Sequence, residues 1–306
     1  MNDFLALGLF TVFVLVLLAL DLGIFQRHPH ALSLREAASW YAFWVALSIA
    51  FNVGVYFWRG PQPALEFLTG YVLEVSLSMD NVFVFAVIFS FMGVQPRFQH
   101  RVLFWGIVGA LIMRAAFIGI GVALVARFDW ILYVFGAFLV ITGVKLFREK
   151  ASEFHPEQNP VLRMARKLFP VTPNYEGAAF VVRREGRQFV TPLLLVLLLI
   201  ESTDVLFAVD SIPAIFAVTL NPFIIYTSNV FAILGLRSLY FILASAIPKF
   251  RYLRPGLSLI LIFVGVKMLI AGVYKFPIVL SLGIICCVLL VAVAASLLVE
   301  RKEKKP

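Results

Sequence analysis

Six carboxylates of this chain lie inside strongly apolar stretches, where an ionised group is expensive. They are Asp21, Glu74, Asp80, Glu201, Asp204 and Asp210. Insertion scales put an aspartate at the centre of a membrane helix at about 2.5–3.5 kcal/mol. Six unpaired acids would therefore cost on the order of 15–20 kcal/mol, more than a fold of ordinary stability can spare. These side chains must face the protein interior, pair with bases, bind a cation or carry protons.

The bases available for pairing inside the apolar stretches are fewer than the acids. They are Arg114, Lys145, Arg237 and Lys267. In a purely structural reading, these bases form permanent salt bridges with the acids. Six acids against four bases leave an excess of two negative charges, which one divalent cation would balance. We expect these bases, together with Asp21 near a span end, to take part in the charge coupling of that cation.

The polar side chains within the apolar stretches offer oxygen almost exclusively. Every histidine lies in a predicted loop. Oxygen ligands favour Mg²⁺, Ca²⁺ or Mn²⁺ over Zn²⁺ or Cu⁺. The expected core ligands are Asp80, Asp204 and Asp210, with Glu74 and Glu201 beside them. Asn81 and Ser211 each follow an acid directly and add further oxygens.

Helix geometry constrains how these ligands meet. Acids six residues apart point about 120° away from each other on a regular helix, so neither Glu74/Asp80 nor Asp204/Asp210 should share a face. Glu201 and Asp204, three apart, should share one. Pro213 removes a helical hydrogen bond from the carbonyl of Val209. The proline predicts either a broken helix with free carbonyl oxygens beside Asp210, or a packing kink.

An internal repeat relates the two groups of acids. Glu74-x5-Asp80-Asn81 aligns with Asp204-x5-Asp210-Ser211, and each motif is followed by an arginine in the next apolar stretch. A Gly-Val-Lys motif then ends each unit, at Lys145 and at Lys267. Each unit holds three spans, so the second copy must enter the membrane from the opposite side. Inverted repeats of this kind are typical of secondary transporters, with the substrate site near the midplane.

The elements that must position these residues are membrane-spanning helices. Of 306 residues, 62% are hydrophobic and only 14% are charged, against about 25% charged in soluble domains. We predict an all-α polytopic membrane protein of about nine spans with an inverted-topology repeat of two three-helix units. The spans are expected near 4–25, 38–58, 64–92, 102–126, 129–147, 190–220, 223–247, 255–274 and 277–299.

The basic residues predict the orientation of the chain. With the N-terminus outside, the inner segments carry 19 Lys and Arg, and the outer loops carry only Arg59, Arg127 and Lys275. This positive-inside bias places the C-terminus in the cytoplasm, which for a bacterial protein means the inner membrane. The net charge of +9 is spread over these short clusters, so we expect the lipid bilayer as a partner and no nucleic acid.

The predicted organisation has five parts. Residues 1–63 hold two N-terminal spans, 64–147 the first three-helix repeat, 148–189 a cytoplasmic loop, 190–274 the second repeat, and 275–306 the last span with a basic tail. In the loop, 160–169 reads as a short basic amphipathic helix on the membrane surface, and 180–190 reads as a small hairpin.

At the acidic motifs the chain resembles the TerC family of bacterial membrane proteins. The resemblance rests on Glu74-x5-Asp80-Asn81-Val82-Phe83 and on the run from Glu201 to Pro213 (ESTDVLFAVDSIP). Span count, the central loop and Arg237 also fit, so it covers nearly the whole chain. It implies a role in Mn²⁺ homeostasis by efflux and an association with tellurium resistance.

Three classes of function are consistent with these features. The first is a secondary exporter of Mn²⁺, or a Ca²⁺ or Mg²⁺ transporter, with protons and metal competing for the same carboxylates. A P-loop motif is missing from the sequence, so we expect neither direct ATP coupling nor a prosthetic group. The second is a non-transporting scaffold or sensor in a metal or tellurite stress-resistance complex. The third, an intramembrane enzyme, explains the repeated pattern less simply, so we expect no enzymatic activity.

Cysteine labelling checks the predicted orientation. In a variant without the native cysteines, single cysteines at Arg59 and Lys275 should react with an impermeant thiol reagent in intact cells, because both positions are predicted to face outward. A cysteine at Arg184 should react only after the cells are permeabilised. Labelling of Arg184 from outside would contradict the orientation and the inversion of the repeat.

Overall fold

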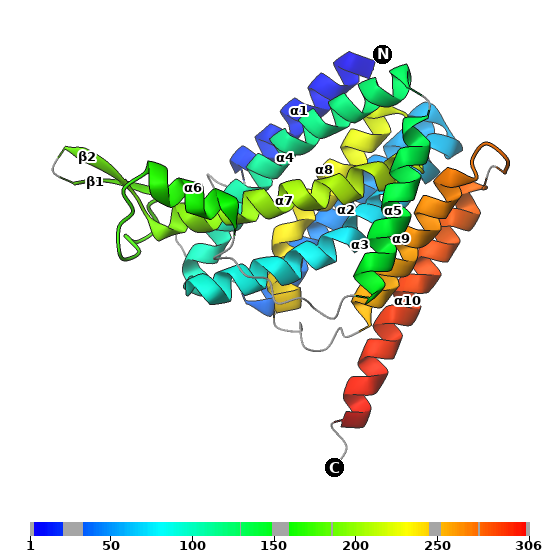
Figure 1. The fold of residues 1–306 in the computed structure, drawn as a ribbon. Coiled ribbons are helices and arrows are strands. Elements are labelled where there is room, and N and C mark those ends of the chain that lie inside the picture. Colours follow the sequence, from blue (N-terminus) through cyan, green and yellow to red (C-terminus); the bar gives the residue numbers. More distant parts are fainter. Residues whose placement is uncertain are drawn as a thin grey trace.

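The computed structural model describes residues 3–20, 33–128, 130–148, 159–184, 186–244, 252–274 and 276–303. Within them lie ten helices and one two-stranded hairpin (Figure 1). The helices are α1 (Asp3–Leu20), α2 (Leu34–Arg59), α3 (Pro61–Met92), α4 (Pro96–Arg127), α5 (Ile131–Arg148), α6 (Pro160–Leu168), α7 (Pro192–Phe216), α8 (Pro222–Ala244), α9 (Leu253–Leu269) and α10 (Ile278–Glu303). The chain is therefore an almost entirely helical protein.

Seven of the described helices are long and apolar enough to cross a membrane: α2, α3, α4, α5, α7, α8 and α10. Two further helices lie at predicted spans but are shorter in the described residues, with α1 apolar over Leu5–Leu20 and α9 17 residues long. The prediction of a polytopic membrane protein is confirmed. Of the nine predicted spans, seven meet the criteria of length and hydropathy.

Proline and glycine set several helix ends. Pro61, Pro96 and Pro192 each occupy the first turn of a helix, where a missing N–H costs nothing. Gly93 ends α3 in the left-handed conformation (φ 65°), and its N–H bonds back to the carbonyls of Phe89 and Ser90. A residue with a side chain would be strained there. These stops fix where the long acidic helices begin and end.

Helix α8 forms the centre of the bundle. Nearly all of its side chains are buried, and it packs against α1, α2, α3 and α4. A helix that is apolar on all sides must be enclosed by protein or lipid. Here the neighbouring helices, α3 and α4 among them, enclose it (Figure 1).

A second packing centre joins α5 to α9 through glycine. A side-chain carbon added at Gly265 would lie 2.6 Å from the carbonyl oxygen of Gly136, and one at Gly143 would lie 3.0 Å from that of Ser258. The Ser258 hydroxyl donates to the Gly143 carbonyl at 2.5 Å. Small residues let two membrane helices approach this closely. The two helices therefore touch backbone to backbone.

The predicted break in the acidic helix at Pro213 is wrong. Helix α7 runs unbroken from Pro192 to Phe216 with Pro213 inside it. The proline lies in the last turn, so it costs one hydrogen bond just before the helix ends anyway. Likewise, α3 is a single helix of 32 residues rather than two shorter pieces.

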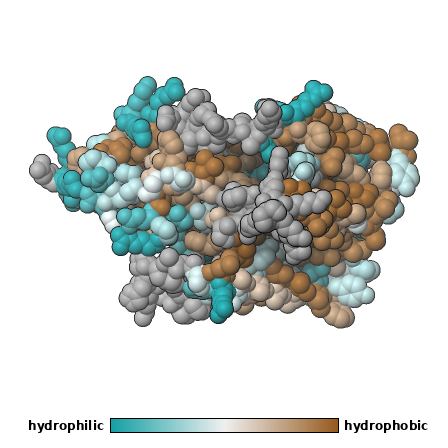
Figure 2. All heavy atoms as spheres, turned by 90° about the horizontal axis from the view of Figure 1, so that it is seen from below, coloured by the Kyte–Doolittle hydropathy of each residue, from teal (hydrophilic) through white to brown (hydrophobic). Residues whose placement is uncertain are grey.

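The loop between α5 and α7 contains both predicted elements. Helix α6 buries Leu162 and Ala165, and a hairpin pairs β1 (Val181–Arg184) with β2 (Arg187–Val190). Asn159 caps α6 with its side-chain oxygen, and its amide donates to the Ser202 hydroxyl of α7 at 2.9 Å. In Figure 2 hydrophilic residues gather on the side that carries the hairpin in Figure 1, and hydrophobic residues on the side of α9 and α10.

The glycine contact between α5 and α9 can be tested by adding one carbon. Gly265→Ala should lower the free energy of unfolding by about 1–3 kcal/mol, because the new methyl group meets the backbone of α5 and overpacks the contact. Gly119→Ala in α4 is the matched control, since nothing lies within 4 Å of the added carbon. Thermal unfolding in detergent measures both. Equal unfolding temperatures for the two variants would contradict the close helix contact.

Candidate functional site

A buried cavity of about 100 Å³ collects most of the predicted metal ligands. It lies between α3, α4, α5, α7 and α9, and its volume exceeds that of a single water molecule. Five of the predicted ligands line it: Glu74, Asp80, Asn81, Asp210 and Ser211. The rest of the wall consists of Arg114, Thr142, Leu77, Leu146, Phe207 and Leu261. We call this space the carboxylate cavity.

Arg114 connects four helices at this cavity. It is 3% exposed and forms an ion pair with Glu74 of α3. Its guanidinium also donates to the side-chain oxygen of Asn229 in α8 at 2.5 Å and to the hydroxyl of Ser211 in α7 at 3.3 Å. The pairing of an arginine of α4 with an acid of α3 agrees with the pairing expected from the sequence. One acid of the cavity is therefore neutralised in this state.

Asp80 and Asp210 are held less tightly. Asp210 lies close to the hydroxyl of Thr142 and within electrostatic range of Lys145, both on α5. Asp80 lies within electrostatic range of Arg254 at the start of α9. Thus the two acids interact with helices that belong to the α5–α9 pair, whereas Glu74 is bound by Arg114.

Glu74 and Asp80 line the same cavity, although the sequence predicted separate faces. Leu77 lies midway between them, and it lines the cavity too. Each acid is about 60° from the direction of Leu77 on the helix. The cavity is wide enough to receive both acids from either side of Leu77, and this width is not visible in the sequence.

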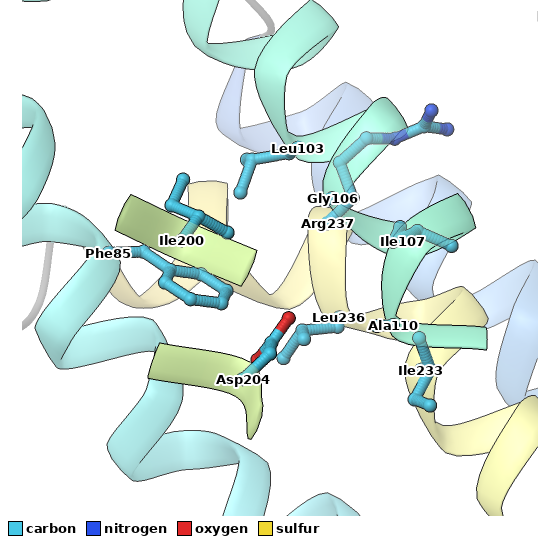
Figure 3. Close-up of a pocket in the computed structure, with 10 residues that line it drawn as sticks. All are labelled: Phe85, Leu103, Gly106, Ile107, Ala110, Ile200, Asp204, Ile233, Leu236 and Arg237. Atoms are coloured by element: carbon cyan, nitrogen blue, oxygen red, sulfur yellow. The ribbon is translucent and has the colours of Figure 1, made fainter. Parts of the chain in front are cut away.

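Asp204 lies in a different and much smaller space. That cavity measures about 10 Å³, room for no more than one water, and its walls are mostly apolar side chains of α3, α4, α7 and α8 (Figure 3). Asp204 is 5% exposed, and its Oδ1 atom has no hydrogen-bond partner in the part of the chain that the structure describes. Arg114 and Glu74 lie within electrostatic range of it. In this state, Asp204 is buried beside the carboxylate cavity rather than in it.

The second predicted arginine does not pair with Asp204. Arg237 lines the same small cavity, but in Figure 3 its guanidinium points away from the Asp204 carboxylate. Glu201 packs against Gly109 of α4, where any added side chain would overlap its carboxyl group. Glu201 and Asp204 therefore both face α4, as their spacing predicted.

Two further predicted residues lie elsewhere. Lys267 lines a separate cavity at the far end of α9. Asp21 lies outside the described residues, so its proposed part in charge coupling stays a prediction. Among the described residues, no three His, Cys, Asp or Glu side chains lie close enough to hold one metal ion together. The ligand set as a whole also stays a prediction.

Four polar residues make contacts that the sequence did not predict. Asn229 is completely buried and accepts a hydrogen bond from Arg114, and Thr142 lines the carboxylate cavity near Asp210. Arg254 was counted with the loops, because it lies at a helix start. Glu66 was overlooked within a predicted span, and it accepts a hydrogen bond from Thr219 at 2.6 Å. The available signal for Glu66 was its charge, and for Asn229 its place in an apolar run.

Comparison with known proteins places the chain in a family. It matches the integral membrane protein TerC family over residues 59–304. An uncharacterized membrane protein of Myxococcus xanthus is 53% identical over 292 residues, which cover 95% of this chain and 92% of that protein. A protein of Escherichia coli (strain K12), named "Putative membrane-bound redox modulator Alx", is 44% identical over 308 residues, covering 97% and 96% of the two chains. No solved structure matches. The chain belongs to the TerC family of integral membrane proteins.

Proposed function

We propose that this protein exports a divalent metal cation, most readily Mn²⁺, across the inner membrane in exchange for protons. The observation that carries the proposal is the carboxylate cavity. Acids and neutral oxygen groups from α3 and α7 line this cavity, and Arg114 forms an ion pair with one of the acids, Glu74. A buried group of acids inside a membrane bundle is expensive, and such groups mark ion pathways.

The chemistry of the wall favours a hard cation as substrate. Carboxylates of Asp80 and Asp210, the amide of Asn81 and the hydroxyls of Thr142 and Ser211 all supply oxygen. Mn²⁺ and Mg²⁺ prefer such ligands, whereas thiolate or imidazole sites select other metals. Cys286 and Cys287 lie on α10, which contributes no residue to the cavity. The cavity therefore supports ion transport better than thiol chemistry.

Arg114 would serve as the counter-charge of the metal-free state. It contacts the side-chain oxygens of Glu74, Ser211 and Asn229 at the same time. An entering ion would need oxygen groups of this kind as ligands. The described acids are too far apart to hold an ion as they stand. Metal entry would then require Arg114 to release Glu74 and the carboxylates to close in. Protons would replace the ion on the return step, since both bind the same oxygens.

The packing of the helices supports the inverted repeat on which this mechanism rests. Helix α3 packs on α8 while its repeat counterpart α7 packs on α4, and the counterparts α5 and α9 pack on each other. The contact between Gly143 and Ser258 has a counterpart in the contact between Gly265 and Gly136. Gly143 corresponds to Gly265 and Gly136 to Ser258, with the same offset along the sequence in both cases. An exchange of partners of this kind is what a two-fold axis between the repeats produces, and three spans in each unit would place that axis in the membrane plane. With the N-terminus outside, the site would open alternately to each side.

Removing single charges from the cavity tests the metal site. Asp80→Asn and Asp210→Asn should each abolish manganese tolerance in an exporter-deficient host, because the amide keeps the volume but loses the charge that holds a divalent ion. Growth over a range of Mn²⁺ concentrations and Mn²⁺ uptake into inverted vesicles measure the effect. Glu176→Gln is the control, since Glu176 pairs with Arg184 at the surface of the loop. If both aspartate variants protect like the parent at equal expression, a scaffold or sensor role replaces transport.

Charge removal at Arg114 tests its part in the cycle. Arg114→Gln should lower the free energy of unfolding by about 3–5 kcal/mol, because Glu74 is then left buried without its partner. Adding Glu74→Gln should restore most of the stability but not Mn²⁺ flux. The exposed pair of Arg184 and Glu176 is the control, and Arg184→Gln there should cost at most about 1 kcal/mol.

Thermal unfolding of the single and double variants, beside flux into inverted vesicles, separates the two roles of Arg114. Recovery of stability and of flux together in the double variant would show that the ion pair is structural only. The same test on Arg237 with Asp204 is less informative, because the Arg237 guanidinium points away from Asp204.

A further inference from the structure

A second and larger cavity lies at the opposite end of α7 from α6 and the hairpin. Its volume is about 290 Å³, and it lies between the first residues of α3, α5 and α10 and the last residues of α7 and α9. The side chains that matter here are Gln62, Phe216, Lys267, Met268, Tyr274 and Phe276. Most of the described wall is therefore apolar or aromatic, and Lys267 supplies an ammonium group.

Within the described part of the chain, the ammonium group of Lys267 has no counter-charge. Among the residues that the structure describes, it takes part in no hydrogen bond or ion pair. Its repeat counterpart Lys145 lies near Asp210. Glu66, one turn after Gln62, accepts hydrogen bonds from Gln62 and Thr219. A half-buried charge without a partner is costly. An anion in the cavity would offset that cost.

Exposed apolar and aromatic side chains surround the turn from α9 to α10, beside the cavity. Val273, Val279 and Leu280 are 94%, 63% and 48% exposed around the turn from α9 to α10. Tyr133, whose hydroxyl lies close to Gly272, and Tyr274 are about half exposed. Exposed aliphatic side chains beside tyrosines are typical of the level at which hydrocarbon gives way to lipid headgroups. The turn beside the cavity therefore has the composition expected at the depth of the lipid phosphates.

We infer that this cavity binds an anionic phospholipid of the outer leaflet. The lipid phosphate would lie against Lys267, with Gln62 and Tyr274 as further polar groups on the wall, and part of an acyl chain would cover Phe216, Met268 and Phe276. A soluble anion would leave those apolar walls unfilled, and a neutral lipid would leave Lys267 unpaired. The inference does not depend on the proposed metal transport. It adds a lipid site at the end of the helix that carries Asp210.

Lipid titration of the purified protein tests this site. In neutral detergent, phosphatidylglycerol should raise the unfolding temperature more than phosphatidylcholine with the same acyl chains. In Lys267→Met that difference should vanish, and native mass spectrometry should show affinity for phosphatidylglycerol weakened about tenfold. Lys267→Met removes an unpaired charge, so it should fold at least as stably as the parent. Lys267→Arg should keep the preference.

Arg127→Met is the matched control for the loss of one positive charge. Arg127 is exposed at the end of α4, on the same predicted outer side, and lies outside the cavity. It should bind phosphatidylglycerol like the parent. Equal preference in Lys267→Met and the parent would overturn the inference, as would equal stabilisation by both lipids. Stabilisation by oleate as strong as by phosphatidylglycerol would overturn the phospholipid assignment in favour of a fatty acid.

Discussion

The buried ion pair between Arg114 and Glu74 constrains the positions of four helices at once. Taking these two charges out of water costs several kcal/mol each, and their attraction repays it only with further hydrogen bonds. Asn229 and Ser211 supply these bonds, so α3, α4, α7 and α8 are fixed to one guanidinium group. Among the described residues, the Arg114 Nε atom and the Asn229 amide nitrogen have no hydrogen-bond partner.

The placement of the other acids follows from the same constraint. Because Glu74 uses Arg114, Asp80 and Asp210 depend on weaker interactions with α5 and α9. Asp204, close to the same arginine, is enclosed by apolar walls with one unpaired oxygen. Asp80, Asp204 and Asp210 would contribute little to the stability of the bundle. The presence of these acids inside the bilayer is explained if they bind a cation or protons.

Much of this could be predicted from the sequence, because charges inside apolar runs stand out. The cost of burying Asp80, Asp210 and Glu74 identified the cavity wall, and the repeat identified Arg114 as a partner. The direction of a long side chain could not be predicted from the sequence. For that reason the sequence did not show that Arg237 points away from Asp204. The contacts of Thr142 and Asn229 could not be predicted, because uncharged polar residues cost little and are common in membrane helices. Pro213 was misread because its effect depends on where the helix ends.

The glycine contact between α5 and α9 has a consequence for how the molecule can move. Helices that meet backbone to backbone cannot slide past one another without overlap, so α5 and α9 form one rigid body. This body carries Thr142 and Lys145, which act on Asp210, and also Arg254, which acts on Asp80. A single tilt of the pair would therefore withdraw both sets of interactions together. The two acids would be released in concert, although they belong to different halves of the repeat.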